Sequence, residues 1–203
     1  MKVFILLIFF LLLSCNNYKS ENQIEINTEK EISKNELLFK NWLIKKQKTI
    51  LKKLNLNDIS KLNSKTLRIW RFPGGGAVFQ EIYELNIDKE ELKLYSSLIE
   101  NVNSIETKEL SKLEYQKVIK NKELTENLIK FSKEKSILKF KNIEEYCKNH
   151  LGCGDSFLIE YKDNLERNTF SIDEGIKKCQ NKNTESPKQL LELIEKMVFE
   201  YGN

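Results

Sequence analysis

Hydrophobic residues recur at helical spacing near both ends of the chain and alternate with polar residues in the middle. Over residues 34–55 and again over residues 187–201 they return every three or four positions, which predicts helices with one apolar face. Ser186 and Pro187 mark the start of the second helix, because serine is a favourable N-cap and proline fits the first helical position. Amphipathic helices are therefore expected at both ends of the folded region.

Between these helices, alternation with a period of two predicts strands. Residues 66–72 alternate, and after the Pro-Gly-Gly-Gly sequence at residues 73–76 the alternation resumes over residues 77–87. Glycine-rich connections join adjacent antiparallel strands, so we expect a hairpin here, with a third strand over residues 92–99. Short connections of this kind favour a meander over parallel βαβ units.

The second half of the chain predicts fewer strands. Residues 108–135 have apolar side chains at helical spacing and are expected to form two short helices broken near Asn121, while residues 136–140 predict a short strand. Residues 156–161 and 167–172 alternate on either side of a polar connection and predict a second hairpin. The whole pattern predicts an α+β fold, with an antiparallel β-meander and hairpins packed against amphipathic N- and C-terminal helices.

Composition and charge narrow the class of protein. The chain has 203 residues, of which 40% are hydrophobic, and this is enough to bury one core, which we place in a domain over residues 34–203. Lys and Arg number 34 against 30 Asp and Glu, and the lysines alternate with glutamate and asparagine instead of forming a basic cluster. Nucleic-acid binding proteins rely on clustered basic residues, so nucleic acid is excluded as an expected partner.

The N-terminus has the pattern of an export signal. Lys2 precedes an uninterrupted apolar run at residues 3–13, and polar residues follow at once. A helix of that length spans about 16 Å, which is too short for a hydrocarbon core of about 30 Å. A leader peptide is therefore predicted here rather than a membrane-spanning helix.

The apolar run ends in Leu-Leu-Ser-Cys at Cys15, which resembles the lipobox of bacterial lipoproteins. The resemblance implies that lipid is attached to the Cys15 thiol and that residues 1–14 are removed as a signal peptide; an ordinary secretory leader is the alternative. Asn16 follows in place of aspartate, which in enterobacterial lipoproteins implies the outer membrane, on its periplasmic or surface side. The polar residues 15–33 are then expected to form a flexible tether.

The body of the chain resembles small uncharacterised lipoproteins of the Bacteroidetes type. The likeness lies in Leu-Arg-Ile-Trp-Arg-Phe at residues 67–72, Cys-Gly-Asp at residues 153–155 and the leucine-rich last helix. It implies a compact α+β body on a lipid anchor and brings no catalytic residues. The chain has a single histidine and lacks P-loop, zinc-protease and serine-hydrolase motifs, so we expect a protein that is not an enzyme and has no cofactor.

Three cysteines remain once the lipobox cysteine carries lipid, and export favours one disulfide among them. The second hairpin has its centre between Asn164 and Leu165. If the strand pairing of this hairpin is continued outward from its centre, Cys153 and Cys147 each lie opposite a position three residues from Cys179. The register alone therefore does not choose between these two partners. A bond between Cys147 and Cys153 is a third possibility. We favour the pair Cys153 and Cys179.

The same region offers a chemical alternative. Two thiols, the only histidine and a carboxylate lie close together in the sequence, at Cys147, His150, Cys153 and Asp155. Such side chains bind zinc, and a Cys–His pair can form a thiolate nucleophile. The spacing lacks the second ligand pair of a structural zinc site, so we rank a disulfide above metal binding or catalysis and predict no metal.

Candidate partner contacts lie in the first hairpin. They are an aromatic and arginine face, Arg68, Trp70 and Phe72, and the loop glycines Gly74, Gly75 and Gly76. Exposed Trp and Arg are enriched at binding hot spots, whereas burial of Trp70 would exclude this surface. The sequence thus predicts a non-catalytic, membrane-anchored envelope lipoprotein that binds another envelope protein or a small ligand. An inhibitor or immunity-type lipoprotein and a Cys/His- or metal-dependent hydrolase are the alternatives.

Overall fold

The computed structural model describes residues 47–48, 50–52, 54–72, 79–99, 110–147 and 154–202, all within the unit Lys46–Asn203. Several sequence predictions fall outside these residues: the signal peptide, the tether, most of the first helix, the loop glycines Gly74–Gly76, and the side chains Cys15, His150 and Cys153. The described part of the first predicted helix is helical at residues 47–48 and 50–52.

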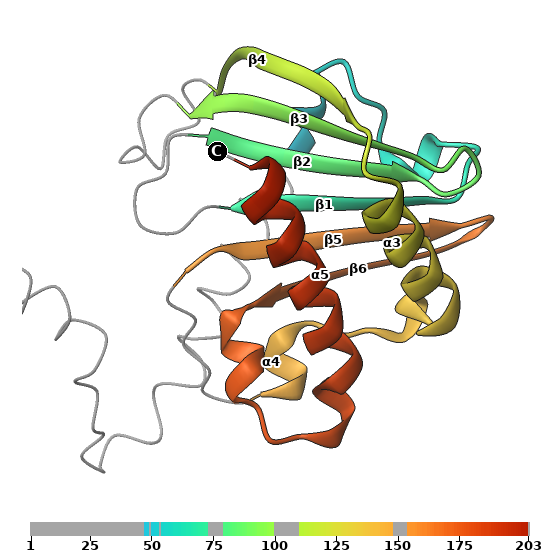
Figure 1. Ribbon diagram of the computed structural model, residues 1–203, viewed down its shortest axis with the longest axis vertical. Coiled ribbons are helices and arrows are strands. Elements are labelled where there is room, and N and C mark those ends of the chain that lie inside the picture. The colour runs from blue at the N-terminus through green and yellow to red at the C-terminus, as the bar shows by residue number, and fades with distance from the viewer. Residues whose placement is uncertain are drawn as a thin grey trace, which may run out of the picture. The chain divides into compact units, whose positions relative to one another are not determined.

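An antiparallel sheet of six strands forms the centre of this unit (Figure 1). The strands are β1 (Thr66–Phe72), β2 (Phe79–Asn86), β3 (Glu91–Ile99), β4 (Leu110–Ile119), β5 (Ser156–Asp163) and β6 (Glu166–Asp173). Their order across the sheet is β4-β3-β2-β1-β5-β6, so the first four strands form a meander and the last two add a hairpin beside β1. The predicted α+β fold, with its meander and second hairpin, is confirmed.

Helices cover one face of the sheet. They are α3 (Lys122–Glu134), the short α4 (Ile143–Tyr146) and α5 (Glu185–Tyr201), with the 3-10 turns η2 (Ile137–Lys139), η3 (Glu174–Lys178) and η4 (Lys182–Thr184). A further 3-10 turn, η1 (Ile59–Lys61), lies in the chain before β1. Figure 1 shows α5 lying across the strands, with α3 beside it. The predicted C-terminal helix is confirmed, although it begins at Glu185, so that Pro187 lies in the first turn, where its missing N–H costs no hydrogen bond.

The main core lies between this face and the helices. Alternate residues of β1 point into it, with Leu67 and Ile69 fully buried, and α5 contributes buried side chains at helical spacing from Leu190 to Met197. The second hairpin has the register expected from its centre, because Asp163 lies opposite Glu166 across a two-residue turn. The hairpin centre inferred from the sequence therefore predicts the observed pairing of β5 with β6.

A second, smaller apolar layer lies on the opposite face of the sheet. Trp70 on β1 and Ile82 on β2 are buried there, although neither belongs to the main core. The chain before β1 covers them: the Asn57 carbonyl accepts a hydrogen bond from Arg68 on this face, and Ile50 and Ile59 are buried. The central strands are therefore enclosed on both faces, which is unusual for an antiparallel sheet of this size.

Two elements differ from the sequence predictions. Residues 110–119 form the edge strand β4, paired with β3, and not a helix. Of the neighbouring apolar residues at its end, Ile119 is buried and Val118 is 46% exposed. Residues 137–139 form the turn η2 in place of a strand. Ser136 has a left-handed backbone (φ 49°) that ends α3, and the chain turns there instead of extending.

Candidate functional site

The proposed contact surface on β1 is buried. Arg68 and Trp70 have no exposed surface, and Phe72 is half-buried. The prediction that this face binds a partner is therefore wrong for Arg68 and Trp70, because the chain before β1 lies over it. The loop glycines that completed the predicted surface lie outside the described residues.

An ion cluster takes the place of the expected binding surface. Arg68 lies between Glu84 on β2 and Glu160 on β5, its direct neighbours across the two adjacent strands. The Arg68 guanidinium donates to Glu84 Oε2 at 2.5 Å, lies 3.7 Å from Glu160 Oε2 and also donates to the Asn57 carbonyl at 2.9 Å. A buried charge of this kind is tolerated only when it is paired and hydrogen-bonded, so the cluster is part of the fold.

The pKa of the Glu160 carboxyl is shifted by its position in this cluster. Burial raises the pKa of its carboxyl above the ordinary value of 4.5, and the field of Arg68 and the hydrogen bond from Trp70 oppose that shift only in part. The indole of Trp70 donates to Glu160 Oε2 at 2.6 Å. Burial therefore decides the direction of the Glu160 pKa shift, against its two partners.

A second ion cluster lies on the α5 face, near the end of β1. Arg71 donates to Glu81 Oε2 at 2.8 Å and to Asp155 Oδ2 at 2.5 Å, and the Tyr83 hydroxyl donates to Glu81 Oε2 at 2.9 Å. Burial raises the pKa of Tyr83, which keeps its hydroxyl protonated as a donor. The backbone of Gly202 packs against this pair, where a Cβ would lie 3.0 Å from both Arg71 Nη1 and Glu81 Oε2. The cluster joins β1, β2 and the residue before β5 to the end of α5.

The two described residues of the alternative metal or thiolate set are engaged in other contacts. Cys147 is bonded to another cysteine and Asp155 is paired with Arg71, while His150 and Cys153 lie outside the described residues. A disulfide sulfur is not a thiolate ligand, so Cys147 in this state cannot serve as one. Among the described residues, no group of three or more His, Cys, Asp or Glu side chains is placed to hold a metal ion.

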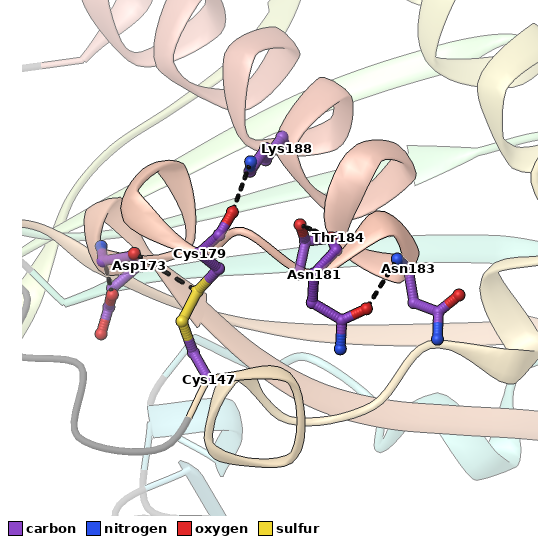
Figure 2. Close-up of a disulfide and its surroundings, with 8 residues drawn as sticks. Cys147, Asp173, Cys179, Asn181, Asn183, Thr184 and Lys188 are labelled. Atoms are coloured by element: carbon purple, nitrogen blue, oxygen red, sulfur yellow. Dashed lines mark hydrogen bonds between the residues drawn. A yellow bond between two sulfur atoms is a disulfide. The ribbon is translucent and has the colours of Figure 1, made fainter.

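The disulfide joins Cys147 to Cys179, with a Cα–Cα distance of 5.8 Å (Figure 2). The favoured pair Cys153–Cys179 is therefore wrong, and one of the alternatives left open by the hairpin register forms instead. The bond joins the residue that follows α4 to the residue that follows η3. The elements α4 and η3 contact one another in the fold. Figure 2 shows the side chain of Lys188, on α5, next to Cys179, and the Lys188 ammonium donates a hydrogen bond to the Cys179 carbonyl at 2.8 Å.

A groove at one end of the sheet is the candidate binding site. It has a volume of about 650 Å³, within the range of small-ligand sites. One wall is the C-terminal end of α3 with η2, and the other is formed by the ends of β5 and β6 and the residues flanking β1 and β2. Its floor is apolar, with Ile137, Ile87 and Tyr161 buried and Leu138 half-buried.

The walls of the groove are held in place by polar contacts. The Asn168 side-chain amide donates to the carbonyls of Ile137 at 2.9 Å and Phe140 at 2.7 Å, which fixes η2 against β6. On the opposite wall, the Lys65 ammonium lies 2.8 Å from Asp163 Oδ1. Such contacts make the groove a preformed feature rather than a gap between mobile segments.

Positive charge predominates at the rim of the groove. Four cations line it, Lys65, Lys133, Lys139 and Arg167, against two carboxylates, Asp163 and Glu166. These residues come from distant parts of the chain and share no spacing, so the sequence offered no signal for them. Only the packing of α3 and η2 against the second hairpin brings them together.

Comparisons with known proteins add no relative to this description. Among the helices that the structure describes, none has both the length and the apolar composition of a membrane-crossing segment. No protein-family model matches the chain, and no curated protein matches it significantly.

Proposed function

We propose that this chain is a lipid-anchored envelope protein whose folded domain acts as a binding or accessory module and not as an enzyme. The observation that carries the proposal is the Leu-Leu-Ser-Cys sequence at Cys15, directly after an apolar run that is too short to cross a bilayer. Lipid on Cys15 would hold the domain at the membrane, because two or more acyl chains give stable attachment where one does not.

Two observations support a binding role for the domain. The groove between η2 and the second hairpin is concave, is partly apolar and has a volume in the range of small-ligand sites. The sequence has one histidine and none of the motifs of common hydrolases, so it offers few of the groups that general acid–base or nucleophilic catalysis requires. We accordingly assign the groove as the binding site of this module.

The anchor is tested by the mass of the N-terminal peptide from protein extracted from native membranes. We expect the mature chain to begin at Cys15 and to carry a diacylglyceryl group, with or without an amide-linked acyl chain. Cys15→Ser should abolish both the lipid and the membrane association, whereas Cys153→Ser is the matched control and should retain them. A mature chain that lacks lipid and is recovered in the soluble fraction would contradict the proposal and identify an ordinary secretory leader.

A further inference from the structure

We propose that the groove between η2 and the β5–β6 hairpin binds an amphiphilic anion, a molecule with one anionic head group and an apolar chain, of which a fatty acid is the simplest example. This inference rests on the proposed function, because it names the ligand class of the same groove. Three features of the groove carry it: its floor, its rim and the balance of charge around it.

The floor of the groove suits an apolar chain. The exposed lining of the groove is more apolar than polar, and Leu138, beside the buried Ile137 and Tyr161, keeps part of its side chain exposed there. An inorganic anion would leave this apolar surface in water, whereas an alkyl chain would cover it and gain about 25 cal/mol for each Å² removed from solvent. The floor therefore favours a ligand with an apolar body over a simple ion.

The rim suits an anionic head group. Lys133, Lys139 and Arg167 have exposed side chains, and within the described residues none of them has a hydrogen bond or an ion pair from its charged group. They stand on three different elements, α3, η2 and β6, around one opening. An oxyanion placed among them would receive charge-assisted hydrogen bonds, which are stronger than neutral ones.

The balance of charge excludes a cationic ligand. Asp163 is already paired with Lys65, which leaves Glu166 as the other carboxylate against the three exposed cations. The C-terminal end of α3 also points here and contributes about half a negative charge. Positive charge still prevails, so an anion is attracted and a cation is repelled.

The proposed anchor makes an amphiphile available to the groove. Lipid on Cys15 would hold the chain at the bilayer, where amphiphilic molecules are concentrated. Free fatty acids and intact anionic phospholipids both present the required chemistry there. The shared feature is an anionic head on an alkyl chain, and the experiment separates the two sources.

The test is photo-crosslinking of the full chain in native membranes. The probes are a fatty acid with a diazirine in its alkyl chain, the same chain ending in an alcohol, and a diazirine-bearing phosphatidylglycerol. We expect the fatty acid or the phospholipid to label peptides covering residues 133–139 or 161–167, and the probe that labels them identifies the source. The alcohol should label these peptides about tenfold less, because it lacks the charge-assisted hydrogen bonds.

Charge variants make the test specific. The double variant Lys139→Ala and Arg167→Ala should reduce labelling of the groove by about tenfold. Its control, Lys178→Ala and Lys182→Ala, removes two exposed lysines from η3 and η4 and should leave labelling unchanged. Both double variants alter exposed side chains, and the Cys147–Cys179 bond, read by peptide mapping, reports that they are folded.

The results separate this inference from the proposed function, because the mass of the N-terminal peptide is read in the same sample. Lipid on Cys15 together with equal labelling by acid and alcohol, or with labelling outside the groove, would overturn the ligand class and leave the anchor standing. Acid-dependent labelling of the groove on a chain without lipid would support the ligand class and overturn the anchor.

Discussion

The indole nitrogen of Trp70 donates a hydrogen bond of 2.6 Å to Oε2 of Glu160, from β1 to the neighbouring strand β5. Arg68 lies 3.7 Å from the same carboxylate oxygen, and its closer partner is Glu84 at 2.5 Å. Two carboxylates therefore share one fully buried guanidinium, and they do so unequally. The unequal distances predict different consequences for the loss of each carboxylate.

Glu160→Gln is expected to change the pH dependence of stability more than stability itself. Burial raises the pKa of Glu160 above 4.5, so the folded state binds its proton more tightly than the unfolded state does. The resulting stabilisation is complete below pH 4.5 and is lost as the pH rises through the raised pKa. The variant keeps an oxygen that accepts from Trp70 but lacks this titration, and urea unfolding from pH 4 to 8 should show a flatter profile.

Glu84→Gln is the matched comparison. It removes the short partner of a guanidinium that has no exposed surface, and we expect a loss of about 3 kcal/mol in the free energy of unfolding at pH 7. The same urea series measures both variants. A larger loss in Glu160→Gln than in Glu84→Gln would show that Glu160 and not Glu84 is the main counter-ion of Arg68, and an unchanged pH profile in Glu160→Gln would contradict its predicted titration.

The disulfide is expected to make a large contribution to stability. The bond between Cys147 and Cys179 closes a loop with a sequence separation of 32, for which the loop-entropy model gives about 3.5 kcal/mol. Cys179→Ala should lower the free energy of unfolding by about this amount, and Cys153→Ala, the control, should leave it unchanged. Peptide mapping without reductant checks the pairing, and a peptide linking Cys153 to Cys179 in the unaltered protein would refute it.

The cluster beneath Gly202 predicts unequal roles for two carboxylates that contact Arg71. The Glu81 side chain has no exposed surface and also accepts from Tyr83, whereas the Asp155 side chain is 25% exposed. Glu81→Gln is therefore expected to cost about 3 kcal/mol and Asp155→Asn about 1 kcal/mol, because water can replace the partner only at the exposed site. Thermal and urea unfolding would measure both, and a larger loss in the Asp155 variant would contradict this ranking.

The turn of the second hairpin depends on its backbone at Asn164. This residue has a left-handed conformation (φ 54°), which asparagine and glycine adopt readily and alanine does not. Asn164→Ala should cost about 1 kcal/mol, and Asn164→Gly should retain the stability of the unaltered protein. Leu165→Ser at the next position is the control, because Leu165 is 99% exposed and its removal should leave the melting temperature unchanged.

Strands and helices whose pattern is strong were predictable from local sequence. Strand β1 has the predicted bounds, and the hairpin centre between Asn164 and Leu165 matches the observed register. Strand β4 was missed because it is an edge strand that faces water on one side, so its exposed Val118 and buried Ile119 do not give a clean alternation. Polar side chains on such an edge conceal the period of two.

By itself, the amino-acid sequence determined the antiparallel α+β plan, the centre of the second hairpin and the short list of cysteines that can pair, because these depend on local periodicity and turn chemistry. Only the tertiary structure decided that Trp70 is buried, that Cys179 bonds to Cys147 and that the cations of the groove meet. Each of these depends on which distant segment lies over a given surface, and neither spacing nor composition encodes that placement.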